Sequence, residues 1–301
     1  MGEILIKSVG FVLFILLAYF LKQRGMLKKE DKRLLGALLI NVNLPCVVIS
    51  GFRGFEYSSA FIIVLVLSFC VCGIGVGLGY LASRKKDNET IALHMLHASG
   101  YNIGTFTLPL VSVFLSKTAV LSVMMFDISN AIMVFGIIFA VTSAVVTKEK
   151  QNPLPLIIKY LTSSVPFLTY IAMILSIALK ITFPSELYVI TDIGASATSF
   201  LSMIMIGVML EFNMKKEDLK QISSAIFVRY AYSLVVAVSI FFMPFDEEIK
   251  KALIICVFSP TSTLNIVFSE KLNCKPSLIG AFSSLNIVIS MTIITCVLIF
   301  M

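Results

Sequence analysis

The chain has 301 residues, of which 58% are apolar and only 14% are charged, and its formal net charge is +7. A soluble domain is nearer half apolar and a quarter charged, so this composition excludes a soluble globular protein and is typical of a polytopic membrane protein. The basic residues form no stripe interleaved with aromatic residues, so the positive charge indicates membrane topology and argues against nucleic acid as a partner.

Ten apolar segments are long enough to cross a lipid bilayer, which takes about 17–25 residues per helix. They are 4–21, 34–52, 59–83, 91–115, 119–146, 161–179, 187–210, 223–243, 252–269 and 277–300. The first has a lone Lys7 in place of a basic start and no small-residue cleavage site, so we interpret it as a span and not a signal peptide. The seventh is the least apolar, because "TDIGASATS" makes its first half polar.

Basic residues are distributed unequally between the two sets of loops. The loops after the odd-numbered spans, with their flanks, hold 18 of the 24 Lys and Arg residues, and this count includes Lys150, Lys215 and Arg229. Cytoplasmic loops of membrane proteins carry such an excess. The bias predicts that these loops face the cytoplasm and that both termini lie on the extracytoplasmic side of the cell membrane.

The chain also divides into two halves of five spans. Residues 1–147 form the first half and residues 156–301 the second, and the segment 148–155 forms a short cytoplasmic linker between them. The fourth and ninth spans hold equivalent positions, and each carries a proline among small polar residues, Pro109 and Pro260. Because five is an odd number, this pattern predicts an inverted repeat.

The fourth span contains "SGYNIGTFTLP" and the ninth "FSPTSTLN", and both are poor helix formers. Irregular backbone at membrane depth is tolerated only where protein or a watery cavity surrounds it. One proline kink is common in membrane helices, but paired interruptions in corresponding spans of inverted halves point to the binding site of a secondary transporter. The second span is interrupted at Asn41, Asn43 and Pro45, and we assign Asn43 to the site because it precedes Pro45 closely. The predicted substrate-binding residues are Asn43, Asn102, Gly104, Thr107, Pro109, Ser259, Pro260, Thr261 and Asn265.

The residues beside the two prolines predict how each helix restarts. Proline favours the first turn of a helix, and Ser and Thr favour its N-cap. Thr107 with Pro109, and Ser259 with Pro260, would therefore begin two half-helices that run in opposite directions. Their N-termini would face a shared centre with free N–H groups and partial positive charge, which suits an anion such as a carboxylate.

The same segments resemble a known family. "NIGTFTLPL" is similar to the Asn-Gly-Gly-Pro-Leu pattern in the fourth span of the auxin efflux carrier family, the PIN-like and malonate-type permeases, and "NLPCVV" and the proline of "FSPTSTLN" are also similar to that family. By position, Asn102, Gly104 and Pro109 match the first crossing segment, and Pro260 and Asn265 match the second.

That resemblance covers essentially the whole chain. It implies an all-α protein of ten transmembrane helices, a five-plus-five inverted repeat with crossing broken helices 4 and 9, similar to sodium/proton antiporters and bile-acid transporters. It implies the transport of small organic anions, often outward. Plant members often carry a long hydrophilic insert between the halves, whereas 148–155 is short, so auxin itself is not implied.

Four polar residues in the spans are candidates for coupling transport to H⁺ or Na⁺. Asp127 and Asn130 lie in "FDISN" of the fifth span, and Asn286 lies in the similar "FSSLN" of the tenth. An ionisable residue inside a membrane is by default a functional hypothesis, although Asp127 could also lie near the surface. His97 could titrate near physiological pH, although a packing role is the simpler interpretation.

The sequence favours a secondary active transporter, with efflux as the expected direction. The alternatives are a sodium- or proton-coupled symporter of an organic anion and a non-transporting membrane sensor of the same fold. We predict no enzyme, because the sequence has no nucleophile–base set and no zinc motif, and neither a metal nor an organic cofactor is expected. The expected partners are a small organic anion and the lipid bilayer, and the sequence leaves open whether the chain forms a homodimer.

Glycines recur at every second position of the third span, in "CGIGVGLGY". The segment lacks the strand–turn–helix setting of a dinucleotide-binding loop. Spacings of four, as between Gly73 and Gly77 or between Gly75 and Gly79, are typical of close helix packing in membranes. We therefore predict a packing face and not a ligand site.

Overall fold

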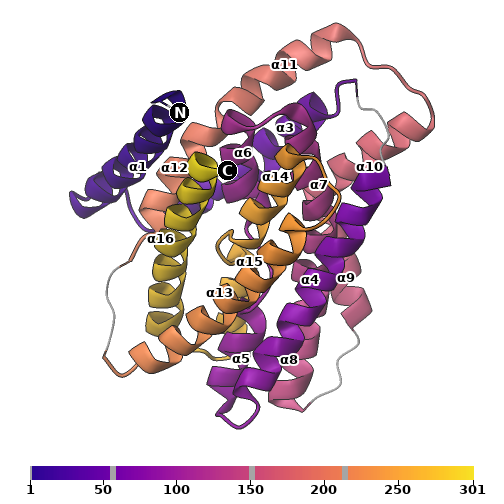
Figure 1. Cartoon of the computed structure of the whole chain (residues 1–301). Helices are drawn as coiled ribbons and strands as arrows, with labels where there is room; N and C mark the ends of the chain where they lie inside the picture. Colours follow the sequence, from indigo (N-terminus) through magenta and orange to yellow (C-terminus); the bar gives the residue numbers. More distant parts are fainter. Residues whose placement is uncertain (1, 55–58, 149–152, 212–215) are drawn as a thin grey trace.

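A computed structural model describes residues 2–54, 59–148, 153–211 and 216–301, and this part of the chain is helical without any strand (Figure 1). In chain order, with η marking π-helix, its helices are α1 (Gly2–Gln23), α2 (Asp31–Leu38), η1 (Leu39–Asn43), α3 (Leu44–Gly51), α4 (Ser59–Ser83), α5 (Asn88–His97), η2 (Ile103–Thr107), α6 (Leu108–Phe114), α7 (Lys117–Ile132), η3 (Met133–Ile137), α8 (Ile138–Thr147), α9 (Pro153–Thr162), α10 (Val165–Ala178), α11 (Ser185–Ser196), α12 (Thr198–Met209), α13 (Leu219–Phe241), α14 (Glu247–Val257), α15 (Thr263–Lys271) and α16 (Pro276–Phe300).

Six helical stretches of the described chain are long and apolar enough to cross a membrane. They are Asp31–Gly51, Ala60–Ser83, Lys117–Thr147, Ser185–Met209, Leu219–Phe241 and Pro276–Phe300. Three shorter apolar stretches are Val9–Gln23, Ile103–Phe114 and Val165–Ala178. The structure is therefore that of an all-helical, multi-pass membrane protein, and the total of ten spans stays a prediction.

Prolines help to decide where two helices begin. Pro45 and Pro109 follow the π-helical segments η1 and η2 within continuous helices, whereas Pro166 and Pro276 lie in the first turn of α10 and α16. The first N–H groups of a helix have no partner within the helix, so the missing N–H of proline costs nothing there.

The segment between the two halves differs from the expected linker. α9 begins at Pro153, inside the predicted linker 148–155, and was not expected as a helix. The rest of the linker from residue 149, with Lys150, lies outside the described residues, as does Lys215.

Contacts group most helices into two bundles. The first, which we call the side bundle, contains α1, α2, η1, α3, α10, α11 and α12. The second, the crossover bundle, contains α4 to α8 and α13 to α16. α9 packs on both η3 and α10.

The glycines of α4 serve packing only in part. A Cβ atom on Gly75 would lie 2.6 Å from Cβ of Ser99, and one on Gly79 would lie 2.5 Å from the carbonyl oxygen of His94. This confirms the close approach of α4 to α5 for these two glycines. For Gly73 and Gly77 the packing prediction was wrong, because a Cβ atom there would meet nothing within 4 Å.

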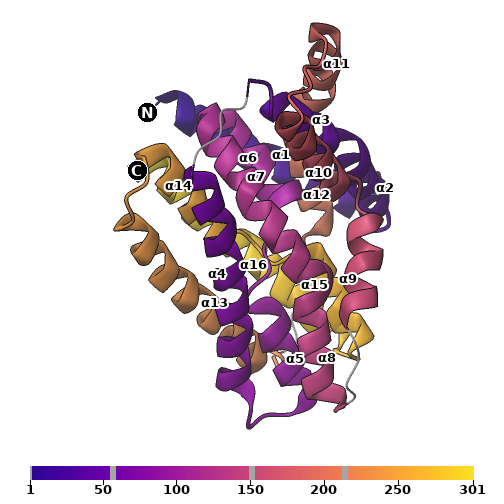
Figure 2. The ribbon, with the colours of Figure 1, turned by 90° about the vertical axis from the view of Figure 1, so that its right-hand side faces the viewer.

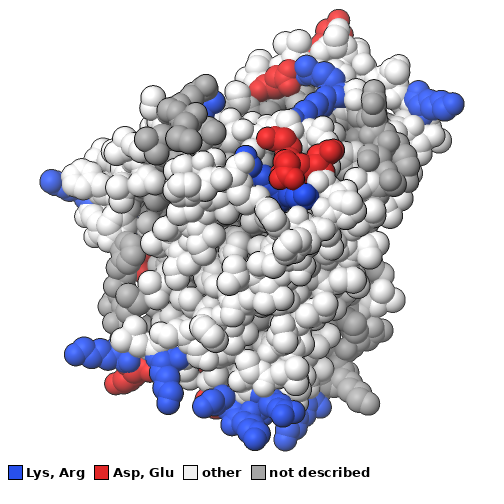
Figure 3. Space-filling view, viewed as in Figure 1, with Lys and Arg blue, Asp and Glu red and all other residues white. Residues whose placement is uncertain are grey.

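Both chain ends lie near one end of the molecule, together with α3, α6 and α11, whereas α5 and α8 reach the opposite end (Figures 1 and 2). On the face in Figure 3, Lys and Arg gather at the end of α5 and α8, while acidic and basic side chains mix at the other end. Arg229 does not belong to the charged residues at either end. It lies in the middle of α13 and is fully buried, so counting it among the loop residues was wrong.

Candidate functional site

The two interrupted spans meet at their interruptions. We call the segments 98–102, between α5 and η2, and 258–262, between α14 and α15, the crossover. Tyr101 and Thr261 form an isolated antiparallel β-bridge within it. Two further backbone hydrogen bonds join the segments, from Asn102 N to Pro260 O (2.8 Å) and from Ser262 N to Gly100 O (3.1 Å). Each segment thus satisfies part of the other's backbone, which irregular structure inside a bilayer requires.

Gly100 is required by the geometry of the crossover. Its φ of +77° lies in the left-handed region, which L-residues with a side chain rarely adopt. In addition, a Cβ atom at this position would lie 2.5 Å from Nδ2 of Asn265.

Two asparagines hold the β-bridge from the neighbouring helices. Asn130 of α7 accepts a hydrogen bond from Tyr101 N (2.9 Å) and donates one to Tyr101 O (2.8 Å). Asn286 of α16 accepts a hydrogen bond from Thr261 N (2.6 Å). Both asparagines of the "FDISN" and "FSSLN" pattern thus accept from the N–H group of a bridging residue, whereas Nδ2 of Asn286 donates to the Tyr230 hydroxyl (2.8 Å) and not to Thr261.

Another asparagine closes the end of a helix. Asn265 of α15 is fully buried, and its Nδ2 donates to the carbonyl oxygens of Leu96 (2.6 Å) and Ser99 (3.2 Å). The last carbonyl groups of an α-helix have no partner within the helix. Asn265 therefore supplies hydrogen bonds to Leu96 at the end of α5 and to Ser99 just after it, which water would supply in a soluble protein.

His97 uses both ring nitrogens inside the crossover. Its Nδ1 lies 2.9 Å from Oγ1 of Thr261, and its Nε2 lies 2.8 Å from Oγ of Ser269. The Ser269 hydroxyl donates to Asn265 O, so it accepts from Nε2–H of His97. The fully buried ring thus links α5 to Thr261 and to α15.

The first half-helix starts earlier than the sequence predicted. The restart at Thr107 and Pro109 was wrong, because η2 already begins at Ile103 and runs into α6 without a break. The physical reason is a π-turn in which Thr107 N donates to Asn102 O (3.3 Å), while Thr105 Oγ1 donates to Asn102 Oδ1 (2.6 Å). Asn102 therefore lies at the N-cap position.

The second half-helix starts later than predicted. The restart at Ser259 and Pro260 was wrong, because α15 begins at Thr263 and Ser262 accepts a hydrogen bond from Leu264 N (3.3 Å). Ser259 lies at the end of the preceding helix, and its hydroxyl donates back to the carbonyl oxygen of Ile255 (3.0 Å). Ser259 thus lies four residues before Thr263, too early to cap α15.

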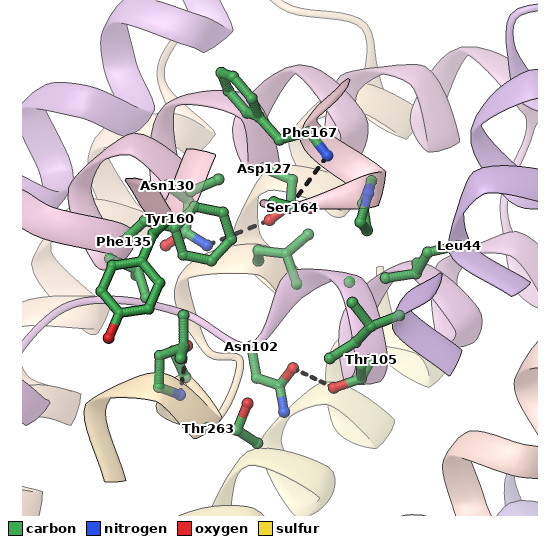
Figure 4. Close-up of a pocket in the computed structure, with 18 of the residues that line it drawn as sticks. Leu44, Asn102, Thr105, Asp127, Asn130, Phe135, Tyr160, Ser164, Phe167 and Thr263 are labelled. Carbon is green, nitrogen blue, oxygen red and sulfur yellow. Dashed lines mark hydrogen bonds between the residues drawn. The ribbon is translucent and has the colours of Figure 1, made fainter. Parts of the chain in front are cut away.

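A cavity of about 290 Å³ lies between the crossover and the side bundle (Figure 4). In the view of Figure 4, Asn102, Thr105 and Thr263 lie on one side and Asp127 and Phe167 on the other. The start of η2 and the start of α15 both contribute to its wall. This volume is close to the lower end of the range for small-molecule sites, about 300–1,000 Å³.

The three π-helical segments of the described chain all reach this cavity. Asn41 of η1, Gly104 of η2 and Phe135 of η3 line it. π-helical turns are rare and occur frequently at functional sites, because they shift side chains and free backbone groups. Their convergence on one cavity indicates a functional site.

Asp127 of α7 is partly buried in the wall of the cavity. Its Oδ1 accepts a hydrogen bond from Asn130 Nδ2 (3.3 Å), and its Oδ2 accepts one from the Tyr170 hydroxyl (3.2 Å). It is the only acidic residue among the described residues of the wall, which also contains no Lys, Arg or His. Within the wall itself, the sources of partial positive charge are therefore the N-termini of η2 and α15.

The predicted site residues fall into two groups. Those that line the cavity are Asn102, Gly104, Asp127 and Asn130. Those that lie in or beside the crossover, outside the described lining, are Thr107, Pro109, Ser259, Pro260, Thr261, Asn265, Asn286 and His97. The second group contributes to the geometry of the crossover and not to the surface of the cavity.

Asn43 belongs to neither group. Its Nδ2 donates to the carbonyl oxygen of Gly194 in α11 (2.8 Å), whereas Asn41 and Leu44 line the cavity. Positions three apart on a helix share a face, so Asn41 and Leu44 point the same way and Asn43 points elsewhere.

Some residues of the site were not expected from the sequence. Tyr160 of α9 and Tyr170 of α10 line the cavity, and nothing in their apolar surroundings distinguished them. Arg229 donates to the carbonyl oxygens of His97 (2.7 Å) and Ser259 (2.6 Å) at the crossover. An arginine inside the apolar stretch "AIFVRYAY" was a signal that could have identified it.

Within the described residues, no three His, Cys, Asp or Glu side chains gather into a group that could hold a metal ion. The described wall of the cavity offers amide and hydroxyl groups, the starts of two helices and one carboxyl group.

Comparison with known proteins agrees with the apolar helices of the chain. No curated protein matches the chain. A family model described as "Membrane transport protein" matches residues 4–299, which is nearly the entire sequence. The chain therefore belongs to this family of membrane transporters, the auxin efflux carriers, as the resemblance of its fourth, second and ninth spans implied.

Proposed function

We propose that the protein is a secondary active carrier of a small organic anion, and that the cavity beside the crossover is its substrate site. The observation that carries this proposal is the convergence of two helix N-termini, from η2 and α15, on one cavity. Free N–H groups and the partial positive charge at such ends favour a carboxylate. Ser262, Thr263 and Thr105 add hydroxyl groups to the same wall.

The arrangement of the bundles supports alternating access. A second cavity, of about 520 Å³, lies at the same boundary between the bundles and is lined by Ser50 and Arg53 of the side bundle and by Ser112 and Lys117 of the crossover bundle. The bundles touch beside this second cavity, where Ser199, which also lines it, donates from Oγ to Pro109 O (2.7 Å). Rocking of one bundle against the other would open and close this contact.

We further propose that ten spans form two inverted halves, residues 1–147 and 156–301. Asn130 and Asn286 each accept a hydrogen bond from the N–H group of a bridging residue, which supports this repeat. The protein would lie in the plasma membrane with the Lys- and Arg-rich end of α5 and α8 in the cytoplasm and both termini outside. That transport is outward and that the chain forms a homodimer are likewise proposals.

Asp127 is the proposed coupling group. A carboxylate substrate would bring a second negative charge into a cavity that holds Asp127, and like charges at close range repel strongly in a low-dielectric site. Binding a proton or Na⁺ at Asp127 removes this repulsion. His97 is less suited to the same role, because both its ring nitrogens are used inside the crossover.

A ligand screen tests the proposal. The purified protein in lipid nanodiscs is heated with monocarboxylates, dicarboxylates, aromatic acids and amino acids, at several pH values, with and without sodium. We expect at least one carboxylate to raise the melting temperature, and its uncharged amide to have no effect. Equal stabilisation by acid and amide, or no stabilisation by any acid, would contradict an anion site.

The coupled symporter is the second candidate, and the place of Asp127 in the cavity wall favours it over a sensor. Uptake into proteoliposomes with an imposed pH or sodium gradient distinguishes the symporter from the sensor. A carrier accumulates the anion, whereas a sensor binds it without accumulation. We propose no enzymatic activity, which agrees with membership in a transporter family.

A further inference from the structure

Arg229 occupies an unusual position for a charged residue. It lies in the middle of α13, is fully buried, and donates from Nη1 to His97 O (2.7 Å) and from Nη2 to Ser259 O (2.6 Å). The first oxygen belongs to the last residue of α5, and the second follows the end of α14 by two residues. One guanidinium group therefore bonds to the end of α5 and to the crossover segment 258–262.

No acidic side chain of the described residues forms an ion pair with Arg229. Its guanidinium carbon lies 4.9 Å from the centre of the Tyr101 ring, and its Nε has no hydrogen-bond partner. Charged side chains inside a membrane are costly and usually pair with another charge or with backbone carbonyls. Here, carbonyl oxygens and an aromatic face take the place of a carboxylate.

The ends of the half-helices explain why a cation fits there. The C-terminus of an α-helix carries a partial negative charge from its unpaired carbonyl groups. α5 and α14 both end at the crossover, so two such ends face each other in a low-dielectric interior. A positive charge bonded to both is stabilised by both and removes their mutual repulsion.

We infer that Arg229 is the positioning residue of the crossover: it joins the C-terminal ends of α5 and α14, and so holds the N-terminal ends of η2 and α15 in place to receive the anion. Tyr101, which Arg229 faces, also lines the cavity. The charge of Arg229 therefore lies one aromatic ring behind the cavity wall and adds to the positive potential there.

Hydrogen exchange of the full chain in nanodiscs tests this inference without any substrate. We would compare the wild type with Arg229→Gln, which removes the charge, and with Arg229→Lys. Lysine keeps the charge but has one terminal nitrogen in place of the two Nη atoms of the guanidinium group. Tyr232→Phe is the matched control. Tyr232 is also a buried residue of α13, but its hydroxyl donates to Val71 O in α4 (2.7 Å) and not to the crossover.

We expect Arg229→Gln to accelerate amide exchange about 10- to 100-fold in peptides covering both segments, 98–102 and 258–262, the factor that the loss of charged hydrogen bonds implies. Arg229→Lys should give a smaller acceleration in the same two peptides. Peptides of α1 and α10 should be unchanged, and Tyr232→Phe should leave both crossover segments protected.

Three results would overturn the inference: acceleration in only one segment, equal acceleration across all helices, or unchanged exchange in Arg229→Gln. The role in receiving the anion rests on the proposed carrier function and has a separate readout. If a carboxylate from the ligand screen binds, Arg229→Lys should retain more affinity than Arg229→Gln. If none binds, the exchange result still decides the positioning role.

Discussion

Asp127 accepts hydrogen bonds from Asn130 and Tyr170 while it faces the cavity, so its carboxyl group is held in place but still reachable. This combination separates it from His97, whose ring is enclosed. A group that changes protonation during a transport cycle needs a path to water, and of the two only Asp127 borders a cavity.

We predict that Asp127→Asn abolishes the pH dependence of transport while it leaves the protein folded. The amide keeps the shape of the carboxyl group but can neither gain nor lose a proton. The measurement is carboxylate uptake into proteoliposomes with and without an imposed pH gradient. Asp246→Asn, at an exposed carboxyl group before α14, is the control and should behave as the wild type. An unchanged gradient response in Asp127→Asn would remove its coupling role.

At the same scale, some of the candidate residues that the sequence indicated line the cavity and others do not. Asn102 and Gly104 were expected at the site and line the cavity, because Asn and Gly inside an apolar span are visible in the sequence. Asn43 was expected there and bonds to Gly194 instead. The direction in which its side chain points depends on how η1 is rotated about its own axis, which the sequence does not show. Arg229 was missed because it was counted with the loops, although it lies within α13.

The elements of the crossover could be located from the sequence, but not their exact ends. The mixture of Gly, Asn and Pro indicated interruptions in the fourth and ninth spans, and α5 and α14 do end there. The restarts were misplaced, since a π-turn at η2 and a cap at Ser262 depend on contacts between the two segments. Such contacts between distant parts of the chain leave no local pattern.

Gly100 gives a prediction for the crossover as an element. Gly100→Ala should lower stability by at least about 1–2 kcal/mol, because alanine is strained at φ of +77° and its Cβ atom would approach Asn265 Nδ2. We would measure the melting temperature of the purified protein. In Gly73→Ala, a helical glycine with open space around its Cβ position, the melting temperature should stay the same or rise. Equal melting temperatures for Gly100→Ala and the wild type would contradict the described geometry.

For the whole molecule, the separation of charge between the two ends predicts its orientation. Lys85 lies in the loop after α4, and Met301 ends the chain at the other end of the molecule. In intact cells, a membrane-impermeant maleimide should label Met301→Cys and should label Lys85→Cys only after permeabilisation. The protein with its native cysteines alone gives the background. The reverse labelling pattern would show that the basic end faces outward.

Two bundles that meet around a cavity next to the crossover form the basis of the proposed mechanism. The side bundle contributes Asn41, Leu44 and Tyr170 to the cavity, and the crossover bundle contributes Asn102 and Asp127. Because the walls come from different bundles, relative movement of the bundles changes the cavity and its access. The central claim is that an organic anion binds there and is carried across the membrane.

Uptake of a radiolabelled carboxylate by proteoliposomes containing Asn102→Ala tests this claim most directly. Asn102 lies at the N-cap position of η2, in the cavity wall, so its loss should reduce uptake about tenfold or more at equal amounts of inserted protein. Asn88→Ala is the control, because Asn88 bonds to Val146 O at the opposite end of α5 (3.1 Å) and should transport normally. Normal uptake by Asn102→Ala would contradict an anion site at the crossover.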